Sequence, residues 1–497
     1  MPRLLSPMHT TLATAFALAC LVRPADGQPA GEPPIRLKSP VAHQVIQRDA
    51  RDFGEIPVVL PDDPKDLKVL KVEVFRPEAG VNHPVPDARY VDGKIERVPV
   101  GGPYGVVVTY ERGSNHEQVS VGPIFVGDLW ILAGQSNMEG VGKLVDVTPP
   151  DDRVMALGMD GKWVRAEEPL HWLVDSPDPV HSGDPATRAE RSAKLHKMRD
   201  SGAGLGLPFA VAMVEATGVP VGLVVCAHGG TSMEQWSPSK KNEGGNSLYG
   251  SMLRQVKLAG GKVKGVLWYQ GESDANDKAA PIYAKTFADF IGAVRGDLDR
   301  PALPFYFVQI GRFVYEGDPR HWNAIQEAQR KIPDEVANTA VVAAVDLELD
   351  DLIHVGTPGL MRLGQRLTNI ALREQFGHMG ASTPALDRVS RGPGNTLVVK
   401  FKGVNRTEED GEVTGLQPDR HIGGFSIRKA DGKEVPYIFD ARVGPSRDAV
   451  VLKLVGDKIP EGSSLWYGWG RDPYCNLVDA LDMAVPVFGP IALDGVK

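Results

Sequence analysis

Between residues 126 and 377, short apolar runs alternate with segments of helical periodicity, and this alternation is the strongest constraint on the fold. The apolar runs predict buried strands, and the amphipathic segments between them predict helices. Alternation of this kind builds a parallel sheet with helices on both faces. The expected strands are 129–133, 221–226, 263–269, 304–310 and 340–345, and the expected helices are 207–216, 248–259, 282–298, 323–332 and 358–376.

The flanking segments have a different pattern, in which short β-type runs alternate with turn residues. Such a pattern with few helical stretches predicts small antiparallel sandwiches. We therefore expect a β-sandwich-like domain over residues 40–125, an α/β domain over 126–378 and a second β-sandwich-like domain over 379–497. Residues 28–39, rich in Pro and Gly, are expected to form a linker. Within the α/β domain, the polar stretch 141–205 is expected to be the loop-rich rim of a cleft.

The first 27 residues have the pattern of a secretory signal peptide. Arg3 precedes an apolar core over 12–22, which is too short to span a bilayer, and a small-x-small motif follows at 25–27. Residues 17–20 also resemble a lipoprotein box, so lipid anchoring at Cys20 is an alternative. Since no later segment is long and apolar enough to span a membrane, we expect a secreted or periplasmic protein.

Charge and cysteine content exclude several function classes. The net charge of -8 gives no electrostatic footprint for nucleic acid or anionic lipid. No Cys/His cluster has the spacing of a zinc site. After signal removal, Cys226 and Cys475 remain, and they form either one disulfide or two buried thiols. Cys226 closes an apolar run, which favours buried thiols. None of these patterns determines the oligomeric state.

A serine follows the first expected strand of the α/β region, within residues 134–140 (Gly-Gln-Ser-Asn-Met-Glu-Gly). Ser136 therefore lies at the carboxyl end of a sheet, where open α/β folds place their sites. Met138 excludes the Gly-x-Ser-x-Gly elbow of the α/β-hydrolases. Taken alone, Ser136 is better explained as a helix cap.

Further candidate site residues follow the later expected strands of the same region. Gly229 and Gly230 follow the strand at 221–226, where they allow a ligand to approach the backbone or simply make a tight turn. Gln270 ends the strand at 263–269 and offers an amide donor to a developing oxyanion. Glu272 and Asp274 come next, either as site residues or as charges in the first turn of a helix.

The last group is an Asp-x-x-His motif. Asp351 and His354 are three residues apart, a spacing that allows the carboxylate to orient the imidazole as a general base. A surface turn is the alternative, and three neighbouring acids are rival orienters: Asp346, Glu348 and Asp350. Because all four groups lie where a strand stops or near the domain's end, we expect them to meet in one site.

This set of motifs resembles the SGNH (GDSL-like) hydrolases, and most closely their sialate O-acetylesterase / carbohydrate esterase family 6 branch. The matching segments are 134–138 (Gly-Gln-Ser-Asn-Met), 229–231 (Gly-Gly-Thr), 268–274 (Trp-Tyr-Gln-Gly-Glu-Ser-Asp) and 351–354 (Asp-Leu-Ile-His). Residues 45–48, 102–104 and 466–470 resemble the branch's flanking β-domains. The resemblance implies an SGNH-type, flavodoxin-like parallel sheet covered by helices and flanked by two β-sandwich domains.

The resemblance also implies a catalytic role for each matching residue. Ser136 would be the nucleophile, His354 the general base and Asp351 its orienter. The oxyanion hole would consist of the Ser136 and Gly229 backbone N–H groups and the Gln270 side chain, with Gly230 as an alternative to Gly229. Gln270 and Gln135 depart from the Asn and Asp of the wider superfamily, as they do in the carbohydrate-esterase branch.

The implied activity is that of a secreted serine carboxylic-ester hydrolase of the sialate O-acetylesterase or acetylxylan esterase type. Its substrate would be an O-acetylated carbohydrate, and no cofactor or metal would be required. Aromatic residues suit stacking on sugar faces, with core packing as the alternative. Candidate substrate-binding residues are Trp236, Tyr269 and Glu272, with Trp163 and Trp172 as further aromatic candidates. The alternative functions are a lipase or arylesterase-type esterase, disfavoured by the lack of an apolar lid stretch, and a non-catalytic carbohydrate-binding protein.

Overall fold

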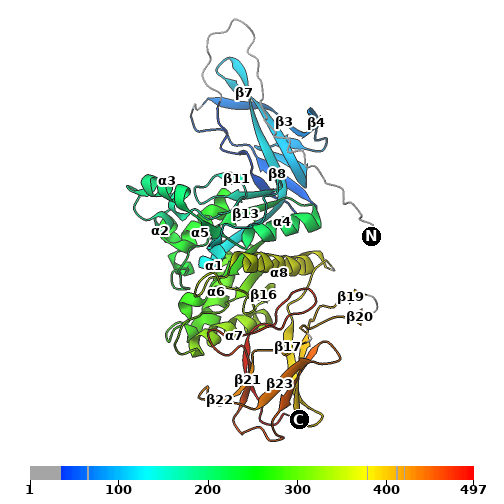
Figure 1. Ribbon diagram of the computed structural model, residues 1–497. Helices are drawn as coiled ribbons and strands as arrows, with labels where there is room; N and C mark the ends of the chain where they lie inside the picture. The colour runs from blue at the N-terminus through cyan, green and yellow to red at the C-terminus, as the bar shows by residue number, and fades with distance from the viewer. Residues whose placement is uncertain (1–34, 64–65, 378, 410–411, 419, 497) are drawn as a thin grey trace, which may run out of the picture.

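The computed structural model describes residues 35–496 apart from 64–65, 378, 410–411 and 419. The predicted signal peptide, Cys20 and residues 28–34 of the predicted linker lie outside the described residues. The chain forms an elongated molecule in which a helix-covered sheet lies between an N-terminal and a C-terminal β-region (Figure 1). None of the helices in the described part of the chain has the length and apolar character needed to cross a membrane.

The central region is a mixed sheet with the strand order β11-β10-β13-β8-β14-β15-β16. All of these strands run parallel except β11, which is antiparallel to β10 at one edge. The strands are β8 (Asn115–Gly134), β10 (Val154–Leu157), β11 (Trp163–Arg165), β13 (Val221–Val225), β14 (Gly265–Tyr269), β15 (Phe305–Gln309) and β16 (Thr339–Ala343). Every strand predicted for this region overlaps one of them, so the α/β prediction is confirmed.

Helices cover both faces of this sheet, as aromatic contacts show. Trp130 of β8 packs edge-on against Phe209 of α4, whereas Trp268 of β14 packs against Phe290 of α6 on the opposite face. Helix α8 packs beside α4, and α5 and α7 lie beside α6. The helices are α4 (Gly206–Thr217), α5 (Leu248–Leu258), α6 (Tyr283–Asp297), α7 (Arg320–Glu335) and α8 (Thr357–Phe376), each of which overlaps a predicted helix.

The order of the strands creates a crevice above β8. The chain leaves β8 in one direction to reach β10, returns through β13, and then continues on the other side of β8 to β14. Strands β13 and β14 thus flank β8, and the connections after them diverge. In open α/β sheets, ligands bind at the carboxyl ends of the strands at such a switch point. The topology therefore directs attention to the residues that follow β8, β13 and β14.

The stretch 141–205 contains more regular secondary structure than the predicted loop-rich rim. It contributes β10 and β11 to the central sheet, which corrects that expectation for residues 154–165. Both strands are shorter than the window over which periodicity can be recognised. The remaining elements are β9 (Gly142–Lys143), η1 (Leu173–Asp175), α2 (Pro179–Ser182), α3 (Arg188–Met198) and β12 (Ser201–Ala203), followed further along the chain by η2 (Pro238–Asn246), η3 (Glu272–Asp274) and η4 (Ala280–Ile282).

The N-terminal β-region is joined to the central sheet through a single strand. Strand β8 pairs with β7 over its first half and with β13 and β14 over its second half, so the predicted boundary at 125–126 falls inside it. A separate three-stranded sheet packs on this region, and Ile56 and Val98 share its apolar core with Val106. The strands are β1 (Val45–Gln47), β2 (Phe53–Pro57), β3 (Leu67–Glu78), β4 (Val81–Pro84), β5 (Arg89–Val91), β6 (Lys94–Pro99) and β7 (Gly101–Arg112).

The C-terminal β-region contains two four-stranded antiparallel sheets that share one apolar core. Leu397 and Leu452 of one sheet contribute to this core together with Leu465 of the other. The first sheet consists of β17 (Ala385–Gly392), β18 (Thr396–Lys402), β24 (Ala449–Leu454) and β23 (Ile438–Val443). The second consists of β22 (Glu434–Val435), β21 (Phe425–Arg428), β25 (Ser464–Tyr467) and β26 (Phe488–Ala492), and β19 (Glu408–Glu409) pairs separately with β20 (Glu412–Val413).

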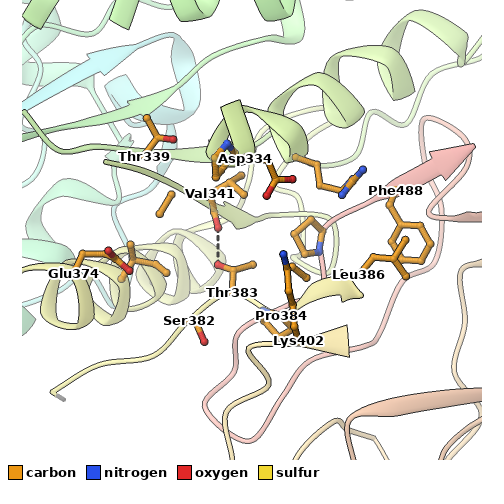
Figure 2. A pocket seen from close by; sticks show the side chains of 16 residues that line it. Asp334, Thr339, Val341, Glu374, Ser382, Thr383, Pro384, Leu386, Lys402 and Phe488 are labelled. Carbon is orange, nitrogen blue, oxygen red and sulfur yellow. Dashed lines mark hydrogen bonds between the residues drawn. The ribbon is translucent and has the colours of Figure 1, made fainter. Parts of the chain in front are cut away.

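Polar groups join this C-terminal region to the central sheet. Arg366 of α8 is 1 % exposed and binds both carboxylate oxygens of Asp346, at 2.8 and 2.7 Å, and the Asp482 carbonyl at 2.6 Å. A cavity of about 190 Å³ lies in the same seam (Figure 2), where the Thr383 hydroxyl donates to the Val341 carbonyl at 2.5 Å.

Cys226 and Cys475 are buried free thiols.

Candidate active site

Ser136 stands where β8 turns sharply into the short helix α1 (Ser136–Glu139). The turn depends on Gly134, whose φ is +133°, because a Cβ there would lie 2.2 Å from the Tyr269 carbonyl oxygen of β14. The Gln135 N–H then donates to that same carbonyl at 2.8 Å. The close contact with β14 therefore fixes Ser136 at the carboxyl edge of the sheet.

His354 lies between Ser136 and Asp351. Its Nε2 is 2.9 Å from the Ser136 hydroxyl, and its Nδ1 is 2.7 Å from Asp351 Oδ2. Because the carboxylate accepts a hydrogen bond from Nδ1–H, the neutral ring presents a lone pair at Nε2 to the serine hydroxyl. The structure thus brings together the three residues predicted as nucleophile, base and orienter.

Asp351 is fixed by its own loop. Its Oδ1 accepts the backbone N–H groups of Ile353 and His354, both at 2.8 Å. Burial acts to raise the pKa of Asp351, but hydrogen bonds from the His354 ring and from these two amides outweigh burial and leave that pKa below its ordinary value. Two of the three rival acids bond elsewhere: Asp350 accepts from the Lys143 amide at 3.2 Å, and Asp346 is paired with Arg366.

Asn137 was not anticipated as part of the site. It is 1 % exposed, its Nδ2 donates to Glu272 Oε1 at 3.0 Å, and its Oδ1 accepts the Val355 N–H at 3.0 Å. Because Val355 directly follows His354, Asn137 joins the histidine loop to the turn after β14. Burial raises the pKa of Glu272. The structure therefore places Glu272, predicted to bind substrate, as the partner of Asn137.

Gly229 lies beside Ser136, but its amide already has a partner. A Cβ at Gly229 would lie 3.4 Å from the Ser136 Cβ. The Gly229 N–H donates to Glu139 Oε2 at 2.7 Å. Burial raises the pKa of Glu139, although the Gly229 amide and the charges of Arg199 and His354 act in the opposite direction. An oxyanion can use the Gly229 donor only after the Glu139 carboxylate has moved away.

Gln270 does not donate into the site. Its side chain is fully buried, and its Nε2 donates to the Thr231 carbonyl at 3.1 Å and to Asp274 Oδ2 at 2.5 Å. Since an amide nitrogen carries two hydrogens, both donors are used within the protein. This geometry corrects the expectation that Gln270 is an oxyanion donor. Gln270 instead ties the loop after β13 to the turn after β14.

The predicted aromatic platforms are core residues. Trp236 and Tyr269 are both fully buried, so neither ring can stack on a sugar, which corrects that expectation. Trp236 donates its indole N–H to Thr231 Oγ1 at 2.9 Å and packs edge-on against Trp268. Trp163 is also buried, whereas the half-buried Trp172 stacks on His196 at a centroid distance of 3.8 Å.

An exposed aromatic ring that the sequence pattern did not single out lies beside the histidine loop. Tyr315 is 63 % exposed and stacks on Phe313 at a centroid distance of 5.4 Å. The Val314 N–H donates to the Leu352 carbonyl at 2.7 Å, which attaches this segment to the loop that carries Asp351 and His354. Val314, Tyr315 and Leu352 together form an exposed apolar patch.

The described residues contain no group of three or more His, Cys, Asp or Glu side chains that could hold a metal ion. The assembled groups are of the kinds that can carry out nucleophilic acyl transfer. A serine hydroxyl is bonded to an imidazole, and a carboxylate orients that imidazole, which is the arrangement of a serine hydrolase.

Comparisons with known proteins relate the chain to carbohydrate esterases. Residues 126–373 match the family described as carbohydrate esterase, sialic acid-specific acetylesterase. The chain is 30% identical over 276 residues to a protein from Arabidopsis thaliana named "Probable carbohydrate esterase", a match that covers 50% of this chain and 92% of that protein. It is 24% identical over 291 residues to sialate O-acetylesterase from Homo sapiens, covering 51% of this chain and 54% of that protein. The chain thus spans about half the length of the human relative.

The fold also resembles a solved structure. A carbohydrate acetylesterase from Xanthomonas citri superposes with a TM-score of 0.60 at 24% sequence identity. The superposition covers 90% of this chain and 97% of that chain, so the likeness includes both flanking β-regions.

Proposed function

The chain belongs to the sialic acid-specific acetylesterase family of carbohydrate esterases, and from this premise we propose that it is a serine esterase that removes acetyl groups from sugar hydroxyls. The contact that carries the proposal is the 2.9 Å distance between Ser136 Oγ and His354 Nε2, with Asp351 at 2.7 Å on the other side of the ring. A polypeptide with a purely structural serine has no need of an oriented base at this position.

In the proposed mechanism, His354 removes the Ser136 proton as the hydroxyl attacks the acetyl carbonyl. The tetrahedral oxyanion is stabilised by the Ser136 N–H, and by the Gly229 N–H once Glu139 has released it. The loss of one such donor typically costs about 3–4 kcal/mol of transition-state stabilisation. His354 then protonates the departing sugar oxygen, which leaves as a free hydroxyl. Water attacks the acetyl-enzyme with His354 again as base, and the release of acetate returns the proton to the Ser136 oxygen.

We propose further that the protein is exported, as residues 1–27 predict, and that its core is an SGNH-type, flavodoxin-like domain between two β-sandwich-like domains. The supporting observation is that the polar groups follow β8, β13 and β14 at the switch point of a parallel sheet. The matched segments at 134–138 and 351–354 contain Ser136 and His354, the proposed nucleophile and general base.

An esterase for apolar acyl groups is the second candidate function. The observation that favours it is the exposed patch of Val314, Tyr315 and Leu352 next to the histidine loop. The polar lining of the cavity beside Gly229 and Gly230 favours a hydroxylated substrate instead. A panel of acetylated xylan, O-acetylated sialic acid and long-chain acyl esters separates the two, because a sugar esterase releases acetate from the first or second and ignores the third.

The decisive test is Ser136→Ala. We expect the loss of acetate release with an unchanged thermal midpoint, because the hydroxyl carries the chemistry. Ser237→Ala is the matched control, since it removes a partly exposed hydroxyl that is bonded to Ser239 Oγ. Activity retained in Ser136→Ala, or lost equally in both variants, would remove the nucleophile from the proposal.

A further inference from the structure

A partly buried chain of polar side chains ends at His228, next to Gly229. Arg254 Nε donates to Asp178 Oδ2 at 2.8 Å, and the Ser251 hydroxyl donates to the same oxygen at 2.5 Å. Ser251 Oγ is also 3.1 Å from His181 Nε2, and His181 Nδ1 is 3.0 Å from His228 Nδ1. His228 is followed directly by Gly229.

The donors and acceptors in this chain can be assigned by elimination. A carboxylate that is paired with Arg254 only accepts, so the single Ser251 proton points to Asp178. Ser251 Oγ must therefore accept from His181 Nε2–H. A neutral imidazole has one N–H, so His181 Nδ1 is an acceptor and His228 Nδ1 must be its donor. The remaining nitrogen of His228, Nε2, then carries a lone pair.

The assignment requires both imidazoles to be neutral. Burial lowers the pKa of His181 to about 3, with the neighbouring charge of His228 acting in the same direction. Burial also lowers the pKa of His228. Two imidazolium rings would in addition point N–H against N–H across 3.0 Å. At neutral pH the pair shares one hydrogen bond, and its direction is set by Asp178.

His228 lines a cavity of about 290 Å³. Gly229 and Gly230 line the same cavity, and a Cβ at Gly229 would lie 3.4 Å from the Ser136 Cβ. A group bound there is within reach of an ester attacked by Ser136. The lining is mainly polar and includes Gln235, Lys240 and Asn246.

We propose that this cavity holds the sugar that carries the acetyl ester, and that His228 Nε2 accepts a hydrogen bond from a free hydroxyl of that sugar. This proposal rests on the proposed function and adds the group that recognises the sugar. Asp178, Ser251 and His181 are positioning residues, because they act only by fixing the tautomer of His228. The site therefore requires a hydroxyl donor on the sugar and disfavours a sugar in which that hydroxyl is already substituted.

The first experiment compares a mono-acetylated methyl glycoside with the same glycoside methylated at the neighbouring hydroxyl. As a third substrate, 4-nitrophenyl acetate measures acyl transfer from an ester that has no sugar. We expect the wild type to prefer the free hydroxyl by about tenfold in kcat/KM, as one buried hydrogen bond predicts. His228→Phe should abolish this preference, and Ser251→Ala should reduce it. Ser239→Ala, outside the chain of residues, should retain it.

The second experiment observes the tautomer directly by 15N NMR of histidine-labelled protein, with the His228 signal assigned by its absence in His228→Phe. We expect a protonated Nδ1 and an unprotonated Nε2 in the wild type, and loss of this fixed tautomer in Ser251→Ala. A protonated Nε2 in the wild type, or a preference unchanged in His228→Phe, overturns the inference. A wild type that hydrolyses none of the esters overturns the proposed function itself, so the two failures are distinguishable.

Discussion

The strongest test of the site's architecture is Asn137→Asp. The substitution preserves the size of the side chain and the acceptor for the Val355 N–H, but it replaces the Nδ2 donor with an oxygen. That oxygen faces Glu272 Oε1 across the 3.0 Å now bridged by a hydrogen bond. The variant therefore replaces one hydrogen bond with a contact between two carboxyl groups. This contact is shielded from water, because residue 137 is 1 % exposed.

The size of the effect follows from charge and proton uptake. Two negative charges 3 Å apart repel by about 5 kcal/mol at an effective dielectric constant near 20. The pair can avoid this by binding one proton, which for an ordinary aspartate costs about 4 kcal/mol at pH 7. The destabilisation is therefore at most about 4 kcal/mol at pH 7. Burial already raises the pKa of Glu272, which makes proton uptake easier and the destabilisation smaller.

The pH dependence has a definite sign. The carboxyl pair has a raised pKa in the folded state, so the stability of the variant is recovered as the pH falls and lost as the pH rises. We expect Asn137→Asp to be close to the wild type at pH 5 and clearly less stable at pH 8, by denaturant unfolding. Activity on 4-nitrophenyl acetate should follow, because the same bridge holds the loop that carries His354.

A second substitution should restore the bridge. When Asn137→Asp is combined with Glu272→Gln, the amide introduced by the second change donates to the new carboxylate, which still accepts the Val355 N–H. Asn137→Ala is the comparison, because it leaves the buried Val355 N–H without a partner, at a cost of about 1–3 kcal/mol, and places no second carboxylate beside Glu272. If Asn137→Asp is fully stable at pH 8, or if Glu272→Gln does not rescue it, the bridging role is refuted.

Three further predictions concern residues other than Ser136, His354 and Asp351. Arg366→Ala should destabilise the fold by about 3–5 kcal/mol in denaturant unfolding, because it leaves the buried Asp346 carboxylate undercompensated; a loss below 1 kcal/mol would contradict this. Burial raises the pKa of Glu168 to about 8, so the wild type should lose stability relative to Glu168→Gln as the pH rises from 6 to 9, and a constant difference would disprove it. Trp236→Ala should cost about 3–5 kcal/mol of stability, while Trp236→Phe should leave the ranking of sugar esters unchanged, since a buried ring contacts no substrate.

The position of Ser136 was predictable because it directly follows a clear strand signal, and His354 was indicated by its spacing from Asp351. An apolar run that stops at a glycine predicts a strand end, and residues at strand ends of a parallel sheet share one edge. Asp351 was ambiguous among neighbouring acids, and the ambiguity is resolved by two backbone amides that point at its carboxylate. No residue pattern reports which carboxylate a loop will turn toward a histidine.

The failures have a common physical cause. Gln270 and Trp236 lie on connections after strands, where a sequence pattern predicts exposure to a cleft. In the structure these connections pack on each other, so Gln270 donates to Thr231 and Asp274, and Trp236 donates to Thr231. Long-range packing between loops leaves no periodic signal in the sequence, which also explains why the role of Asn137 was missed.

Strand β8 gives the molecule a continuity that separate modules would lack. Its 20 residues are bonded to β7 at one end and lead directly to Ser136 at the other. The N-terminal sheet and Ser136 are therefore connected by one continuous strand. Cutting the gene at the apparent domain boundary would split this strand in mid-ladder. A minimal catalytic fragment should instead begin before residue 101, so that β7 still braces the strand that carries the serine.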